Sequence, residues 1–269
     1  MGTMKIENYS GTANTFTFPD NPKLVDDASN SNMQVTNVPF SNVHIFITSG
    51  ALDPKNLTLN GFFRGASKLS NYNTLTENVF APQLKKLYFE TDRFYIVKGL
   101  NCKKTNQGGR TQFIDYVANF ATPISFVFSD TQKSASYNGS AWTDGTQTNA
   151  GSHVTYIEEI VVSINGNGSN GTFIIADNSG NGITVTLSSY TSGDTLIIYL
   201  IRDDNDRGIY TTENWYCTLN GVKVPRKTTS GKYSLNLSLQ PEEAVNTLTI
   251  SGTLPYSTSV IKWRDAYLG

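Results

Sequence analysis

The side chains that most often carry catalysis or bind metals are sparse in this sequence. It contains two histidines, His44 and His153, and neither has a partner at a spacing that a zinc site would use. The motifs GxSxG, HExxH and CxxC and the phosphate-binding P-loop are absent as well. The sequence therefore predicts no catalytic residue, no metal ligand and no cofactor.

Two segments match known binding motifs only in part. Gly166, Gly168 and Gly171 satisfy the GxGxxG pattern, but the run TFIIAD that follows predicts a strand, whereas a dinucleotide site needs a helix there. The acidic cluster Asp203–Asp206 lacks the combination of glycine and distant glutamate that a calcium loop has. We expect a hairpin loop at the glycines and a solvated loop at the acids, with weak calcium binding as the minor alternative.

Paired carboxylates could serve glycoside hydrolysis, but spacing alone does not select a pair. Glu158 and Glu159 are neighbours on a predicted strand, so their side chains should point to opposite faces and not form one dyad.

Three aromatic residues are candidates for stacking on a glycan: Trp142, Trp215 and Tyr216. Trp142 lies in a polar segment and is expected to be exposed, either as an anchor of the linker or as a contact with a partner. Alternation in NWYCTL puts Trp215 and Cys217 on one face of a strand and Tyr216 on the other. We expect Trp215 to pack in a core, with an exposed platform as the alternative.

The basic segment KGLNCKKTNQGGR, residues 98–110, is predicted to be the tip of a hairpin. A solvated turn is the simplest interpretation. The alternative is a contact with a neighbouring subunit or partner through Lys103, Lys104 and Arg110.

Composition favours a mostly β protein. Of the 269 residues, 16% are charged and 12% are aromatic, and much of the polarity comes from Ser, Thr, Asn and Gly. The formal net charge of −1 argues against specific nucleic-acid binding. We see no signal peptide or membrane span, so we expect synthesis in a cytosol and no membrane partner. Cys102 and Cys217 are expected to be two buried thiols.

The organisation of the chain predicts two domains separated by a polar linker. Residues 131–152 are rich in Ser, Thr, Asn and Gly with little apolar periodicity, so we place an N-terminal domain at 1–130 and a C-terminal domain at 153–269. After the linker, short β-branched and aromatic runs alternate with turn signals such as LNG and SGD, as in a β-sandwich. The predicted strands there cover residues 156–164, 172–176, 183–187, 195–201, 215–219, 233–239, 247–251 and 259–263.

The first half predicts a β-sandwich or barrel with one packed helix. Strand-like runs cover residues 14–18, 43–48, 57–63, 94–100, 113–120 and 124–128. Between them, residues 71–87 have apolar residues three to five apart, as in an amphipathic helix that Pro82 interrupts or restarts.

Several phrases resemble the distal tail proteins of long, non-contractile-tailed phages. LDPKNLTLNGFFRG, residues 52–65, and LKKLYFETDRFYIVKGLNCKK, residues 84–104, resemble the family's N-terminal domain, in which strand, helix and strand precede a long hairpin. LSLQPEEAVNTLTISG, residues 237–252, and SVIKWRDAYLG, residues 259–269, resemble its jelly-roll-like, galectin- or carbohydrate-module-like C-terminal domain.

The resemblance implies a structural virion protein at the tail tip. Family members form a ring, usually a hexamer, that joins the tail tube protein to the tail-tip or baseplate proteins. The N-terminal domains form the ring and the C-terminal domains project outward. The resemblance brings no catalytic residues. Two alternatives stay open: a carbohydrate-binding or adhesion module that recognises a cell-surface glycan, and a hydrolase without recognisable motifs.

Overall fold

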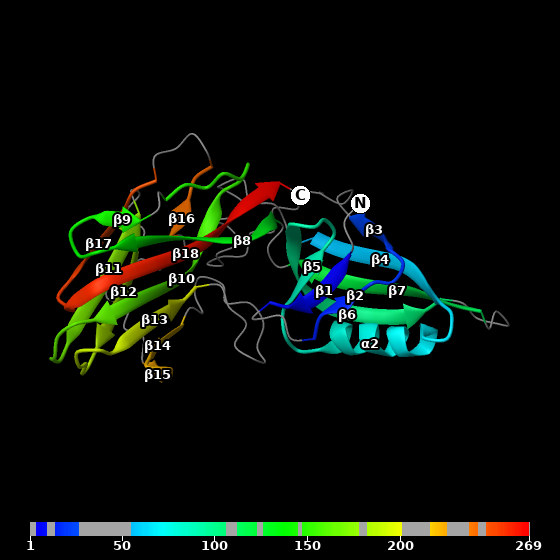
Figure 1. Cartoon of the computed structure of the whole chain (residues 1–269), viewed down its shortest axis with the longest axis horizontal. Helices are drawn as coiled ribbons and strands as arrows, with labels where there is room; N and C mark the ends of the chain where they lie inside the picture. Colours follow the sequence, from blue (N-terminus) through cyan, green and yellow to red (C-terminus); the bar gives the residue numbers. More distant parts are fainter. Residues whose placement is uncertain are drawn as a thin grey trace, which may run out of the picture. The chain divides into compact units, whose positions relative to one another are not determined.

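The structure, a computed structural model, divides into two compact units. It describes residues 4–9, 14–26, 55–105, 112–122, 126–144, 147–177, 182–200, 216–224, 237–241 and 246–268. Unit 1 contains the described residues up to Asp130, and unit 2 begins at Thr131. Both units are mostly β, as the composition predicts, and the helix α2 of unit 1 is the one α-helix of these described ranges (Figure 1).

Unit 1 consists of two antiparallel sheets that share the long strand β6 (Arg93–Lys104). The first half of β6 pairs with β5 and β8, and its second half pairs with β7. The first sheet contains, in order, β2 (Phe16–Thr17), β1 (Lys5–Asn8), β5 (Lys85–Tyr88), β6 and the start of β8 (Phe126–Tyr137). The second contains β3 (Lys23–Asp26), β4 (Lys55–Arg64), β7 (Phe113–Thr122) and β6.

Alternation along the strands of unit 1 explains why these sheets enclose a core. On β7, Ile114, Tyr116, Ala118 and Phe120 are buried, and the residues between them are half-buried. On β4, Leu57, Leu59 and Phe63 are buried on the same side of the sheet, where the Phe63 ring stacks on Tyr116 with ring centroids 4.6 Å apart. The predicted β-sandwich or barrel with one packed helix is confirmed.

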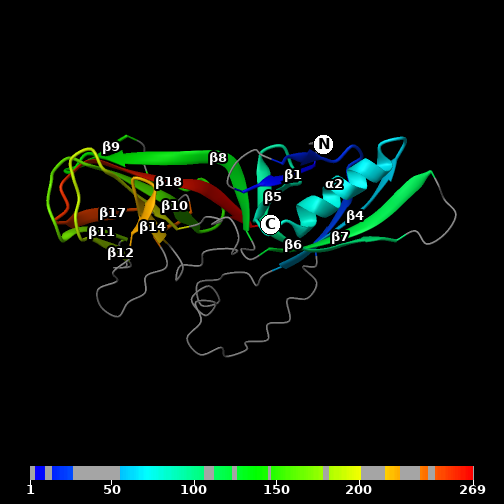
Figure 2. The same cartoon turned by 90° about the horizontal axis from the view of Figure 1, so that it is seen from below.

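Helix α2 (Lys68–Phe80) is shorter than the helix predicted over residues 71–87. Its last backbone hydrogen bond runs from the Ala81 N–H to the Glu77 carbonyl, and Pro82, which has no N–H and disfavours a helical residue before it, follows at once. The apolar residues Leu84 and Leu87 that extended the helical pattern lie instead directly before β5 and within it. The helix packs along β4, β6 and β7 (Figure 1, Figure 2).

Gly99 is the position that lets helix and sheet approach each other. A Cβ at this residue would lie 1.9 Å from the carbonyl oxygen of Val79 in α2. The pairing of β6 with β7 also shifts register between Gly99 and Asn101, so that Leu100 is an extra residue and is 50% exposed. Only glycine fits this contact, because the opposing atoms belong to backbone that has no free rotation.

Unit 2 is a sandwich of two antiparallel sheets. The larger contains, in order, β15 (Val222–Val224), β14 (Tyr216–Leu219), β13 (Thr195–Tyr199), β10 (Thr155–Ile164), β18 (Tyr256–Leu268), the rest of β8 and β9 (Trp142–Asp144); β16 (Ser238–Leu239) pairs with the start of β10. The smaller contains β12 (Gly182–Leu187), β11 (Gly171–Asp177) and β17 (Leu248–Gly252). Inward residues of both sheets, among them Ile160, Phe173, Val185 and Trp263, form one core.

The turns of unit 2 that contain glycine and asparagine have the positive φ angles that the sequence predicts. In the turn LNGV between β14 and β15, Asn220 and Gly221 have φ angles of 48° and 81°, the left-handed pair that a two-residue hairpin requires. Gly193, in the predicted turn SGD, has a φ of 95°. The ability of asparagine and glycine to adopt positive φ angles therefore determines where the chain turns in these hairpins.

Strand β8 lies at the point where the sequence predicts a domain boundary. Its residues 126–130 belong to unit 1 and residues 131–137 to unit 2. The segment 131–152, predicted to be a linker, contains the rest of β8 and also β9. Strand β9 pairs with β8 through Asp144 and Trp142.

We predict that Gly99→Ala destabilises the protein by about 2 kcal/mol or more, because the new methyl group would overlap backbone that has no room to move. The midpoint of urea unfolding measures the effect. Leu100→Ala is the matched control, since this neighbouring side chain is half exposed and its truncation should cost about 0.5 kcal/mol or less. An unchanged midpoint for Gly99→Ala would show that β6 and α2 can separate at no cost.

Candidate functional site

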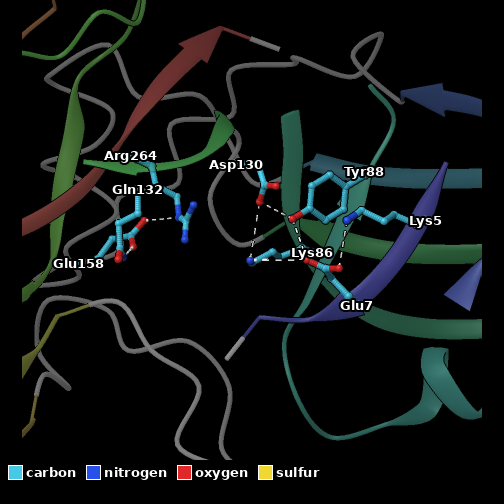
Figure 3. Close-up of polar contacts among 8 residues, drawn as sticks. All are labelled: Lys5, Glu7, Lys86, Tyr88, Asp130, Gln132, Glu158 and Arg264. Carbon is cyan, nitrogen blue, oxygen red and sulfur yellow. Dashed lines mark hydrogen bonds and ion pairs between the residues drawn. The ribbon is translucent and has the colours of Figure 1, made fainter. Parts of the chain in front are cut away.

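A dense group of polar side chains in the described part of unit 1 joins strands β1, β5 and β8. Antiparallel pairing sets Lys5 opposite Tyr88 and Glu7 opposite Lys86, so alternation places all four on one face of the sheet. Asp130, from β8, completes the group (Figure 3). We call these five residues the Tyr88 cluster.

The Tyr88 cluster is held by short polar contacts between opposite charges. The Tyr88 hydroxyl lies 2.7 Å from Glu7 Oε1 and 2.5 Å from Asp130 Oδ1. Lys5 Nζ lies 3.2 Å from Glu7 Oε2, and Lys86 Nζ lies 3.6 Å from Glu7 Oε1 and 4.0 Å from Asp130 Oδ1. Two ammonium groups therefore balance two carboxylates, which allows Glu7, 4% exposed, to be buried.

Burial, and then the two neighbouring carboxylates, raise the pKa of Tyr88 far above its usual value. The phenol therefore keeps its proton and acts as a hydrogen-bond donor to the carboxylates, not as a base. Its single proton is shared between two acceptor oxygens on different strands. This arrangement suits cross-linking of β1, β5 and β8 better than proton transfer to a substrate.

Sequence reasoning missed the Tyr88 cluster. The sequence does show two short segments in which polar side chains lie two residues apart, as on one face of a strand. These pairs are Lys5 with Glu7 and Lys86 with Tyr88. That signal does not say that the two segments pair.

A second polar cluster lies in unit 2, around Glu158. The pairing of β10 with β18 shifts register between Ile157 and Glu159, which makes Glu158 a bulge residue. Glu158 is 6% exposed; its Oε1 lies 3.2 Å from Arg264 Nε, and its Oε2 accepts a 2.8 Å hydrogen bond from Gln132 Nε2 (Figure 3). Glu159 pairs instead with Lys262, 2.6 Å away. Each carboxylate thus has its own cation, which agrees with the expectation that Glu158 and Glu159 do not form a dyad.

The predicted contact lysines point to opposite faces of strand β6. Lys103 is exposed and registers with Val117 of β7. Lys104 has its ammonium 4.7 Å above the ring of Tyr72 in α2. Arg110 lies outside the described residues. A contact of Lys103, Lys104 or Arg110 with another subunit stays a prediction.

Trp142 is not the exposed residue that its polar surroundings predict. It is half-buried against the core of unit 2, because it lies on β9 and its indole N–H donates a 3.0 Å hydrogen bond to the Leu248 carbonyl. Its ring also packs near Tyr137, with centroids 5.2 Å apart. These contacts make Trp142 an anchor of β9.

The Tyr216 ring contacts another ring and an ammonium group. The Tyr199 ring lies 4.8 Å from it, centroid to centroid, and the Lys223 ammonium lies 4.9 Å from its centroid. It is half-buried, whereas Cys217 is buried, as alternation predicts. Trp215 lies outside the described residues, and glycan contact by Trp142, Trp215 or Tyr216 stays a prediction.

The described residues contain no group of three or more His, Cys, Asp and Glu side chains that could hold a metal ion. His153 has its Nδ1 3.2 Å from the Val154 carbonyl, and His44 and Asp203–Asp206 lie outside the described ranges. Cys102 and Cys217 are buried free thiols, as predicted. None of the helices within the described ranges is long and apolar enough to cross a membrane.

Comparison with solved structures finds components of phage tails and baseplates. The crystal structure of the Dit (gp 19.1) protein of SPP1, described as a paradigm of the hub adsorption apparatus in phages that infect Gram-positive hosts, is similar with a TM-score of 0.49 and 13% identity, over 100% of this chain and 90% of that one. The phage P2 baseplate in its activated conformation with Ca is similar with a TM-score of 0.48 and 10% identity, over 98% and 97% of the two chains. The same baseplate with Sr gives a TM-score of 0.45 and 10% identity, over 97% of each. No protein-family model and no curated protein sequence matches the chain.

We predict that Tyr88→Phe lowers the free energy of unfolding by about 1–3 kcal/mol near neutral pH, because two carboxylate contacts lose their donor. The raised pKa of Tyr88 stabilises the fold below about pH 10, and this contribution is lost as the pH rises, because the unfolded chain releases the proton first.

Stability measured by urea unfolding should therefore fall less steeply above about pH 10 in Tyr88→Phe than in the wild type. Tyr116 and Tyr156 also have pKa values raised by burial, so part of the alkaline loss should persist. Tyr199→Phe is the control, and equal slopes for Tyr88→Phe and the wild type would contradict the role of the phenol.

Proposed function

We propose that this protein is a structural, non-catalytic component of a phage tail tip that assembles into a ring, with hexamers as the expected order. In this role it joins the tail tube protein to the tail-tip or baseplate proteins, and its place is the virion. Unit 1 forms the ring and unit 2 projects from it.

The observation that carries this proposal is the distribution of exposed apolar side chains. Among the described residues, the exposed large hydrophobics of unit 1 are Val25, Phe62, Leu69, Phe80, Leu100 and Phe113, whereas unit 2 has Val222. Scattered single residues of this kind need no explanation, but their concentration in one unit supports contacts of that unit with other proteins. Unit 1 is therefore the unit that we assign to assembly.

The order of elements supports the same proposal. The N-terminal segments that resemble the distal tail family contain strand β4, in residues 52–65, and strands β5 and β6, in residues 84–104. With helix α2 between them and β7 after them, the order is that which the resemblance implies. Strand β17 likewise precedes the final strand β18.

The edges of the second sheet of unit 1 are compatible with a ring. Among the described residues, the order β3, β4, β7, β6 is antiparallel throughout, so the two outer strands of this order, β3 and β6, run in opposite directions. A second copy beside this sheet could therefore continue the antiparallel pattern, which is one kind of heterologous contact that can close a ring. The lysines and the bulge at Leu100 would limit nonspecific pairing at the β6 edge.

Light scattering over a concentration series tests the proposal. We expect the mass to rise from that of one 29.5 kDa chain to a closed multiple, and negative-stain images of that species to show a central hole. Val222→Ser is the control, because this exposed residue lies in unit 2 and its substitution should leave assembly unchanged. A strict monomer at every concentration would count against the ring and direct the next experiment to a glycan array.

A further inference from the structure

Unit 1 presents an apolar, basic face on the sheet β3, β4, β7 and β6. Phe62 and Phe113 are 40% and 37% exposed, and their rings contact each other edge to face with centroids 5.8 Å apart. Alternation places Lys23, Lys98 and Lys103 on the same side as these rings. We call these five residues the open sheet face.

The charges on the open sheet face are mostly positive. Asp115, half-buried, pairs in register with Phe62 and is an acid on this face. Arg64, opposite Phe113, is bound by Asp20 at 3.0 Å. The charges of Arg64 and Asp20 cancel each other. The remaining charged residues on this face are three lysines and Asp115, so its net charge is positive.

Helix α2 presents a second apolar surface, with an acid in it. Leu69, Asn73, Glu77 and Phe80 are exposed and follow one another at intervals of four, four and three residues, which places them along one stripe of the helix. Leu69 and Phe80, at its two ends, are 52% and 58% exposed. We call these four residues the α2 stripe, and Glu77 is its charged residue.

The open sheet face and the α2 stripe lie on opposite sides of unit 1. The inward side of the sheet meets α2, since Gly99 approaches the Val79 carbonyl and Lys104 lies over Tyr72. Phe62 and Lys103 alternate with inward neighbours and therefore point away from the helix. Figure 2 shows α2 on one side of β4 and β7.

We propose that copies of this chain associate head to tail, with the open sheet face of one copy against the α2 stripe of the next. Each surface offers at least two large apolar side chains, and the lysines of one complement Glu77 of the other. A contact of sheet face with sheet face would instead oppose lysines to lysines. Unlike surfaces on opposite sides make a heterologous contact, which closes into a ring when the rotation allows it.

This inference rests on the proposed self-association and specifies its contact surfaces. Two double variants test it: Phe62→Ser with Phe113→Ser on the open sheet face, and Leu69→Ser with Phe80→Ser on the α2 stripe. All four side chains are exposed, so both proteins should fold, and circular dichroism with urea midpoints checks that they do. Glu77→Lys is a milder variant that keeps every apolar contact and should shift assembly to higher concentration.

We expect each double variant alone to stay monomeric by light scattering where the wild type assembles. An equimolar mixture of the two should form dimers, because one copy keeps an intact sheet face and the other an intact stripe. A mixture that stays monomeric overturns the head-to-tail contact, and double variants that assemble like the wild type overturn the choice of surfaces while the ring survives. A wild type that is monomeric at every concentration overturns the proposed ring as well.

Discussion

The close contact between strand β6 and helix α2 constrains the architecture of unit 1 more than any other interaction. Strand β6 belongs to two sheets, and it passes under α2 at Gly99, where even a methyl group would overlap the backbone of the helix. The bulge at Leu100 lies directly after this point. Because β6 changes partners there, the position of the helix and the division into two sheets depend on the same few residues.

Buried charge in this protein serves to tie strands together. In unit 1, two lysines and two carboxylates surround a phenol that keeps its proton, so Glu7 can be buried without an uncompensated charge. In unit 2, Arg264 neutralises the carboxylate of Glu158 at a bulge, and Gln132 donates a hydrogen bond to it. Asp130 and Gln132 both lie on β8, on either side of the boundary between the units, so each part of this strand is fixed within its own unit.

The exposed apolar side chains of unit 1 are the basis on which we assign association to this unit. Two aromatic rings on an open sheet and two apolar side chains on a helix are costly to leave in water unless another surface covers them. Unit 2 differs in this respect: Trp142 and Tyr216, which could have been exposed platforms, are held by Tyr137, Tyr199 and Lys223. The contrast favours association through unit 1.

Local patterns in the sequence determined the class of fold. Alternation on β7 and β10, the positive φ at Asn220 and Gly221, and the end of α2 before Pro82 all follow from interactions among near neighbours in the chain. The same patterns extended the helix wrongly into residues 84–87. A short apolar run fits both the helical and the strand periodicity, and only its partner strand decides between them. These patterns also predicted an exposed Trp142 in a linker, because no local pattern indicates its hydrogen bond to the carbonyl of Leu248, which is 106 residues away.

Only the tertiary structure decided which side chains meet. Glu7 and Tyr88 are 81 residues apart, and the register of β1 with β5 alone brings them within hydrogen-bond distance. The Glu158 bulge and the opposition of the α2 stripe to the open sheet face likewise depend on pairing between distant strands. Alternation fixes the face of a strand on which a residue lies, but long-range pairing fixes its neighbours, and a single sequence does not contain that pairing in any local pattern.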